Sequence, residues 1–200
     1  MDNKLARIVI INLPVIFFFY LLYTPLSPRP YSNIIYFAGL AVLGIASIRE
    51  YHWVKHGHWK WLGVGIFSMC LFYLAMRLGF SFVAGSQIPI GTDKWSYFVE
   101  PWQRISLLIS FPALILVVVS MELFYRGYVQ ETLCKYFNVR HAILVTSLLS
   151  AIRGSGVGLM PGFIDFILAL AWGLIYSEAG LLPAIATHLC WDILFVYFPP

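Results

Sequence analysis

Charged residues are scarce in this chain of 200 residues. Lys, Arg, Asp and Glu together make up 11% of it, whereas soluble globular domains carry about a quarter. Hydrophobic residues make up 60% and aromatic residues 18%. Such a chain lacks the charge to cover its surface in water, which excludes an ordinary soluble domain. The composition predicts an all-α integral membrane protein, a polytopic bundle of transmembrane helices.

Cysteines and basic tracts are also sparse. The three cysteines, Cys70, Cys134 and Cys190, lie in or beside apolar segments, and their spacing forms no metal-binding motif. They are predicted to be packing residues that face lipid or the helix core. The formal net charge of +4 is not gathered into a basic run, so no nucleic-acid partner is expected.

The order of apolar segments predicts about seven spans in a single membrane domain over residues 1–200. At 1.5 Å rise per residue the fourth span would be about 50 Å long, well beyond the roughly 30 Å hydrocarbon core. It must therefore tilt, protrude or break, and Gly127 is its weakest point. The fifth and sixth spans are short enough to be re-entrant. The predicted spans are 8–23, 32–48, 62–84, 105–137, 141–152, 163–176 and 180–198.

The flanking charges predict the orientation, because Lys and Arg are enriched in cytoplasmic loops. No small-residue cleavage site follows the first span, so an uncleaved N-terminal helix is expected. A cytoplasmic N-terminus places seven basic residues inside and four outside. A bacterial inner membrane suits so compact a chain. The inner set is Lys4, Arg7, Arg49, Lys55, Lys60, Lys135 and Arg140, and the outer set is Arg29, Lys94, Arg104 and Arg153.

Ionisable residues interrupt the apolar segments of the second half. A charged side chain at the bilayer centre costs about 2.5–3.5 kcal/mol on the translocon-insertion scale, so such residues normally face a protein interior. Glu122 and Arg126 are four residues apart and share one helix face, as do His188 and Asp192. Counted along their helices, Glu122, Arg153 and His188 lie at comparable depth. The sequence therefore predicts one buried aqueous pocket lined by these residues.

Two of these stretches resemble a known family. The segment ELFYRG at 122–127, followed by GLLPAIATHLCWD at 180–192, is similar to the CAAX-protease and bacteriocin-processing family, also called CPBP or Abi. The resemblance covers the core at about 105–198, after the N-terminal spans of 1–104. It implies a glutamate-dependent intramembrane endopeptidase. It further implies that a first Glu and a second-motif His activate water, while a third-motif His with Asn or Asp forms the oxyanion hole.

The chain departs from the family pattern at the water-activating positions. Met121 stands where the first Glu is expected, and Arg153 replaces the second-motif His. Arginine stays protonated in proteins and cannot accept a proton. Glu122, one residue along the helix, is rotated by about 100° from the direction of the expected base. The matching positions are Glu122 and Arg126 in the first motif and His188 and Asp192 in the third.

Three functions remain open. The first is an intramembrane endopeptidase with altered chemistry, in which Glu122, His188 and Asp192 are catalytic. In that case Arg126, Arg153 and Met121 line or brace the pocket. The second is an inactive relative that binds a peptide or protein tail in the membrane, as a chaperone or immunity protein. The third is a small proton- or ion-coupled transporter. The bilayer is the expected surrounding in each case, and no cofactor is expected.

Each polar residue also has a structural interpretation. The Glu122–Arg126 pair can staple helices, and Arg153 can either line the pocket or extend to the outer membrane surface. Asp165 and Glu178 lie near helix ends and are predicted to be interfacial. No metal site is predicted, because the histidine-rich segment is assigned to a surface loop. The histidines of that loop are His52, His56 and His58.

Overall fold

The computed structural model describes residues 59–85, 99–100, 102–155 and 159–199. Within these ranges every regular element is helical, which confirms the all-α class for this part of the chain. The predicted spans 8–23 and 32–48 and the histidine-rich loop lie outside the described residues. The elements are α3 (Trp59–Gly85), α5 (Leu107–Glu122), η2 (Leu123–Gln130), α6 (Glu131–Cys134), α7 (Val139–Gly154), α8 (Leu159–Ala179) and α9 (Leu181–Tyr197).

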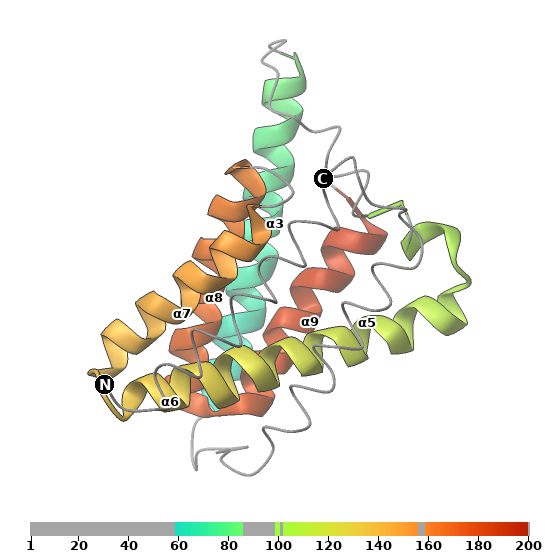
Figure 1. Cartoon of the computed structure of the whole chain (residues 1–200). Coiled ribbons are helices and arrows are strands. Elements are labelled where there is room, and N and C mark those ends of the chain that lie inside the picture. The colour runs from blue at the N-terminus through green and yellow to red at the C-terminus, as the bar shows by residue number, and fades with distance from the viewer. Residues whose placement is uncertain (1–58, 86–98, 101, 156–158, 200) are drawn as a thin grey trace, which may run out of the picture.

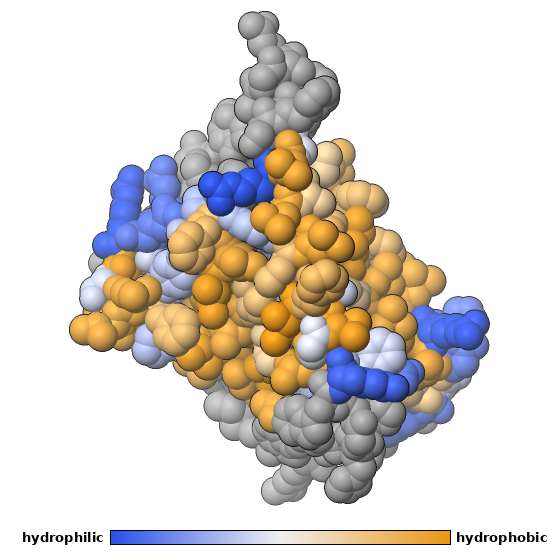
Figure 2. Space-filling view, turned by 180° about the vertical axis from the view of Figure 1, so that it is seen from behind, coloured by the Kyte–Doolittle hydropathy of each residue, from blue (hydrophilic) through white to orange (hydrophobic). Residues whose placement is uncertain are grey.

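Among the described residues, three stretches of helix are long and apolar enough to cross a membrane, namely Lys60–Gly79, Leu107–Cys134 and Leu159–Ala179. Helix α9 is a shorter apolar helix. The surface agrees with this assignment, because apolar side chains cover most of the described face in Figure 2 and hydrophilic ones lie at its edges. Leu108 and Leu159 are among the most exposed, at 87% and 89%. The protein is thus an integral membrane protein.

One long helix is built from α5, η2 and α6 (Figure 1). It runs at a steep angle to α8 and α9, and contacts α9 through α5 and η2 and α8 through η2. The segment η2 is a π-helix, whose hydrogen bonds reach one residue further than those of an α-helix. Gly127, the predicted weak point, lies inside η2, so the helix changes its winding there and continues. Glu122 is the last residue before this change.

Local capping explains where the next helices begin and end. Asn138 caps α7, since its side-chain oxygen accepts a hydrogen bond from the His141 backbone N–H at 3.0 Å. Gly180 adopts a φ of 94° between α8 and α9, a conformation that favours glycine. Its N–H donates to the Tyr176 carbonyl at 2.9 Å and so closes α8.

The predicted length of the sixth span is wrong. Helix α8 extends beyond 163–176 in both directions, and its 21 residues are long enough to cross a membrane. The sequence prediction missed the first turn because that turn contains Pro161 and Gly162. Proline is tolerated in the first turn of a helix, where its missing N–H would have no helical partner.

Small residues allow the helices to approach closely. A Cβ atom at Gly162 of α8 would lie 3.0 Å from the Ala151 carbonyl oxygen of α7. A Cβ at Gly65 of α3 would lie 2.4 Å from Thr187 Cγ2 of α9. Close backbone approach of this kind is typical of helix pairs in membranes. Helices α3, α8 and α9 share an apolar core that includes Met69, Trp172 and Phe195.

Candidate functional site

Glu122 and His188 are in direct contact. Glu122 ends α5 and His188 lies within α9, yet Glu122 Oε1 and His188 Nδ1 are 2.7 Å apart, a hydrogen bond. Both residues are buried, with 2% and 3% of their surfaces exposed. Two groups that the sequence places at one depth on different helices therefore meet inside the molecule.

The buried carboxylate of Glu122 has a second charged neighbour. Its Oε2 lies 3.5 Å from Arg126 Nε, so the predicted i, i+4 ion pair is present. The Arg126 guanidinium also donates to Gln130 Oε1 at 3.5 Å. Gln130 in turn donates from Nε2 to the Gly173 carbonyl at 3.1 Å, which ties this face of η2 to α8. Gln130 was not predicted from the sequence, although its spacing of four from Arg126 is a usable signal.

The imidazole of His188 is held on several sides. Its Nε2 lies 3.7 Å from Asp192 Oδ1, one helical turn along α9. The indole of Trp172 stacks on the ring, with centroids 3.6 Å apart and planes 15° apart. The imidazole therefore lies between two carboxylates and against an aromatic face. Trp172 was missed because an aromatic residue in an apolar helix is usually a packing residue.

Arg153 is buried and bound to Asp165. Its Nη2 donates to both carboxylate oxygens, at 3.2 Å and 3.1 Å. Its Nη1 lies 3.3 Å from the Met121 sulfur, and its guanidinium carbon lies 5.4 Å from the centroid of the Tyr125 ring. Only 6% of the residue is exposed. The alternative in which Arg153 extends to the outer membrane surface is wrong.

The interfacial assignment of Asp165 is also wrong. Besides Arg153, its carboxylate accepts a hydrogen bond from Ser150 Oγ at 3.0 Å, and only 14% of its side chain is exposed. The two partners of Asp165 lie on α7, which forms a hairpin with α8. The prediction failed because Asp165 was judged by its position along one helix and not by the helix opposite.

These contacts join six ionisable residues into one polar cluster. Arg153 interacts electrostatically with both Glu122 and Asp192, and so connects the two halves of the cluster. Its three carboxylates carry three negative charges and its two guanidinium groups carry two positive charges. The cluster is therefore neutral when it holds one additional proton, either on a carboxyl group or on the imidazole. The members of the polar cluster are Glu122, Arg126, Arg153, Asp165, His188 and Asp192.

Several buried polar atoms around the cluster make no hydrogen bond within the described part of the chain. They are Tyr125 Oη and Trp172 Nε1, whereas Glu122 Oε2 and Arg126 Nε, which also lack a hydrogen bond, face each other as the ion pair at 3.5 Å. Buried polar atoms normally find a protein or water partner, so unused hydrogen-bonding capacity marks a place for water or a ligand. The chemical capacity of the cluster is therefore to bind polar groups and to hold a proton. The predicted aqueous pocket stays a prediction.

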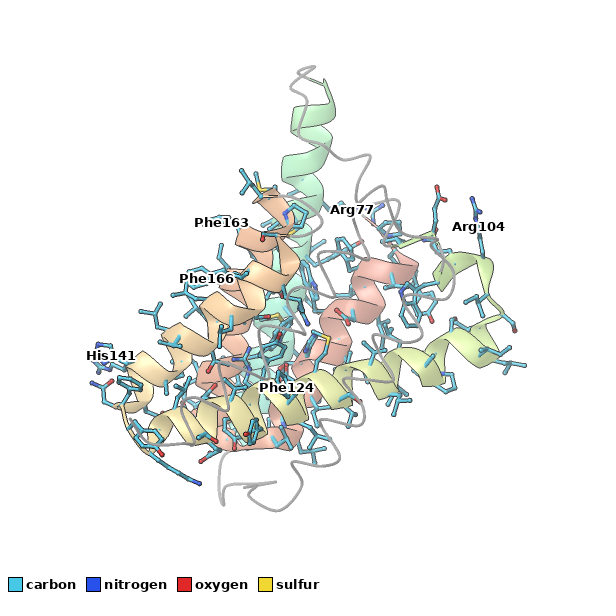
Figure 3. All side chains as sticks on the ribbon, viewed as in Figure 1. Arg77, Arg104, Phe124, His141, Phe163 and Phe166 are labelled. Atoms are coloured by element: carbon cyan, nitrogen blue, oxygen red, sulfur yellow. The ribbon has the colours of Figure 1, made fainter. Side chains whose placement is uncertain are left out.

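Several other ionisable residues of the described helices lie away from the polar cluster. Glu178 is exposed, and His141 is exposed at the start of α7, where its ring nitrogen Nδ1 contacts Asn138 (Figure 3). Arg77 is exposed on α3 and donates to the Tyr73 hydroxyl at 3.4 Å. Within the described ranges, no group of three or more His, Cys, Asp or Glu side chains is arranged to hold a metal ion.

Comparison with known proteins points to one family. Residues 102–194 match the family model described as type II CAAX prenyl endopeptidase Rce1-like. The matched range runs from before α5 into α9 and contains every member of the polar cluster. No curated protein and no solved structure matches the chain.

Proposed function

Because residues 102–194 belong to the Rce1-like family of type II CAAX prenyl endopeptidases, which is the CPBP family expected from the sequence, we propose that this membrane protein binds a peptide or protein tail without cleaving it by the family mechanism. One observation carries the proposal. Arg153 is bound to both oxygens of Asp165 and contacts the Met121 sulfur. Positions 121 and 153 are those at which the resemblance expects the water-activating pair.

The chemistry of these side chains argues against general-base catalysis at that place. A thioether is only a weak hydrogen-bond acceptor, and a guanidinium has no acceptor at all. The Asp165 carboxylate is already engaged by Arg153 and Ser150. Loss of a general base typically costs a factor of about 10² to 10⁴ in rate. Water held between Met121 and Arg153 would therefore lack a partner that can take its proton.

Binding, in contrast, needs only the groups that the polar cluster retains. His188 and Asp192 keep the third-motif residue types, and the Trp172 N–H and Tyr125 hydroxyl are buried donors that make no hydrogen bond within the described residues. A peptide backbone offers carbonyl acceptors that such donors can satisfy. Hydrogen bonds of this kind contribute to affinity because the buried donors otherwise remain unpaired.

A second candidate function is hydrolysis by a rearranged Glu122–His188 dyad. The 2.7 Å hydrogen bond between these residues favours it, because it is the geometry that a carboxylate uses to orient an imidazole base. Against it, the other Glu122 oxygen faces Arg126, and both His188 nitrogens face carboxylates. The dyad would need one imidazole nitrogen to turn toward water.

The test uses the purified full chain in lipid nanodiscs with fluorescent membrane-tethered peptides that end in varied tails. Tail binding is measured by fluorescence anisotropy and cleavage by mass spectrometry. We expect binding without cleavage, and binding weakened at least tenfold by Trp172→Phe or Asp192→Asn. Cleavage by the unaltered chain that is lost in His188→Ala would instead establish the rearranged dyad.

A revertant provides the matched comparison. Met121→Glu with Arg153→His restores the family residue types, but Asp165 would then lose its guanidinium partner. The informative variant is therefore the triple Met121→Glu, Arg153→His, Asp165→Asn, with Asp165→Asn alone as its control. Cleavage by the triple variant only would support the proposal. Proton-linked uptake by liposomes containing the unaltered chain, abolished by Asp192→Asn, would establish the transporter in its place.

A further inference from the structure

Two of the three cysteines lie on neighbouring helices. Cys70 is on α3 and Cys190 is on α9, and both are half-buried free thiols. These helices pack against each other and share the apolar core. The third cysteine, Cys134, ends α6 and serves as an internal reference for the other two.

The register of α3 against α9 brings the two cysteines together. On one side of them, a Cβ at Gly65 would meet Thr187 Cγ2 at 2.4 Å. On the other side, the rings of Phe72 and Trp191 lie 5.5 Å apart. Cys70 falls between Gly65 and Phe72, and Cys190 falls between Thr187 and Trp191. The flanking contacts therefore place both thiols in the same stretch of the interface.

The thiols themselves also interact. The Cys190 thiol lies close enough to Cys70 for the two side chains to interact electrostatically. The close approach at Gly65 matters here, because a disulfide needs Cα atoms about 4.4–6.8 Å apart, which only helices in direct contact can provide. Without a side chain at Gly65, the backbones of α3 and α9 can lie near enough for the two sulfur atoms to reach each other.

We propose that Cys70 and Cys190 are a reversible redox pair that can be oxidised to a disulfide joining α3 to α9. Both thiols belong to apolar helices, so the matching oxidant is lipid-soluble, and a quinone is the appropriate chemical class. Two S–H bonds break and one S–S bond forms. Both electrons and both protons pass to the quinone, which becomes a quinol.

The disulfide would act on the helix that carries the polar cluster. Cys190 lies between His188 and Asp192 in sequence. A covalent link to α3 at this point restricts any sliding of α9 and fixes the position of the imidazole. Formation of the disulfide does not depend on what the polar cluster binds. The redox proposal can therefore be tested independently of the proposed function.

The experiment treats the full chain in liposomes with duroquinone, and in parallel with copper phenanthroline as a strong oxidant of adjacent thiols. Free thiols are then counted in denaturant with a maleimide. Peptide mapping without reductant identifies the linked pair. We expect one remaining thiol, Cys134, a linked Cys70–Cys190 peptide, and return of all three thiols after dithiothreitol.

Matched variants make the result decisive. The Cys134→Ser variant should lose both of its remaining thiols on oxidation. The Cys70→Ser and Cys190→Ser variants should each keep both of their remaining thiols and form no disulfide within the chain. The oxidised Cys134→Ser protein should also unfold at a temperature a few degrees higher than its reduced form. Two free thiols in Cys134→Ser after copper phenanthroline, or disulfides formed only between chains, would overturn the proposal. A link formed with copper but not with duroquinone would overturn the assignment of the oxidant.

Discussion

At the scale of single residues, the charge of Arg153 is balanced inside the molecule. The residue is 6% exposed, and its nearest opposite charge is the Asp165 carboxylate at 3.1 Å. Removing one partner of a buried ion pair leaves an uncompensated charge, whereas replacing both with apolar residues can be neutral. The pair is therefore a sensitive point of the fold, whatever the protein binds.

The cost of an unpaired buried charge predicts the stability of three variants. Arg153→Met and Asp165→Leu should each lower the free energy of unfolding by about 3–5 kcal/mol, and the double variant should recover most of the loss. Chemical denaturation in detergent measures all three. The control is Arg104→Ala, which removes an exposed ion pair with Glu100 and should change stability by less than about 1 kcal/mol. Additive losses in the double variant would contradict the role of the ion pair.

A second residue-scale prediction concerns Gly173. A Cβ there would lie 2.9 Å from Ile143 Cγ2 and 3.2 Å from Gln130 Oε1. Gly173→Ala should therefore destabilise the protein by about 1–3 kcal/mol, as overpacking does. Gly79→Ala is the matched control, because nothing lies within 4 Å of a Cβ at that position. It should be neutral or stabilising, since alanine favours a helix by up to about 1 kcal/mol. Equal effects at the two positions would show that the contact at Gly173 is unimportant.

At the scale of elements, η2 sets the directions of the cluster residues on the long helix. Glu122 precedes this π-helical segment, whereas Arg126 and Gln130 lie within it. A π segment contains more residues per turn than an α-helix, so it shifts the faces on its two sides relative to each other. Shortening η2 by one residue should turn Gln130 away from Gly173.

Deletion of Tyr128 tests this point, because it shortens η2 by one residue at its half-buried position. The deletion should lower the thermal midpoint by clearly more than Tyr128→Ala, which removes the ring and keeps the register. It should also abolish tail binding in the nanodisc assay. A deletion variant as stable as Tyr128→Ala would mean that the extra residue does not position Gln130.

The elements also show what the sequence can and cannot predict. The pairs Glu122–Arg126 and His188–Asp192 were found because a spacing of four defines a helix face regardless of tertiary structure. The Arg153–Asp165 bond was missed because it depends on how α7 and α8 are placed in their hairpin. The sequence predicted only a weak point at Gly127 and not the π-helical winding of η2, because π segments leave little local signal in composition.

At the scale of the whole molecule, the apolar surface and the three candidate spans of the described residues indicate that the protein is embedded in a lipid bilayer. Its orientation in the bilayer is predicted from the distribution of charged residues alone. The count of about seven spans is not confirmed, since the described residues contain three candidates and one shorter apolar helix. We propose a cytoplasmic N-terminus in a bacterial inner membrane, from the uneven distribution of Lys and Arg.

Two features locate the described helices relative to that orientation. The turn between α6 and α7 carries Lys135 and Arg140 and is predicted to be cytoplasmic, whereas Arg104, before α5, is predicted to lie on the opposite side. A single cysteine introduced at Asn138 or Arg104, in a chain with its own cysteines replaced by serine, can be labelled with a membrane-impermeant maleimide. In intact spheroplasts the cysteine at 104 should react and that at 138 should not, while inverted vesicles should give the opposite pattern. Labelling of the cysteine at 138 in intact spheroplasts would reverse the predicted orientation. Glu131 of α6, which accepts a hydrogen bond from the Tyr176 hydroxyl, would then lie on the outer side.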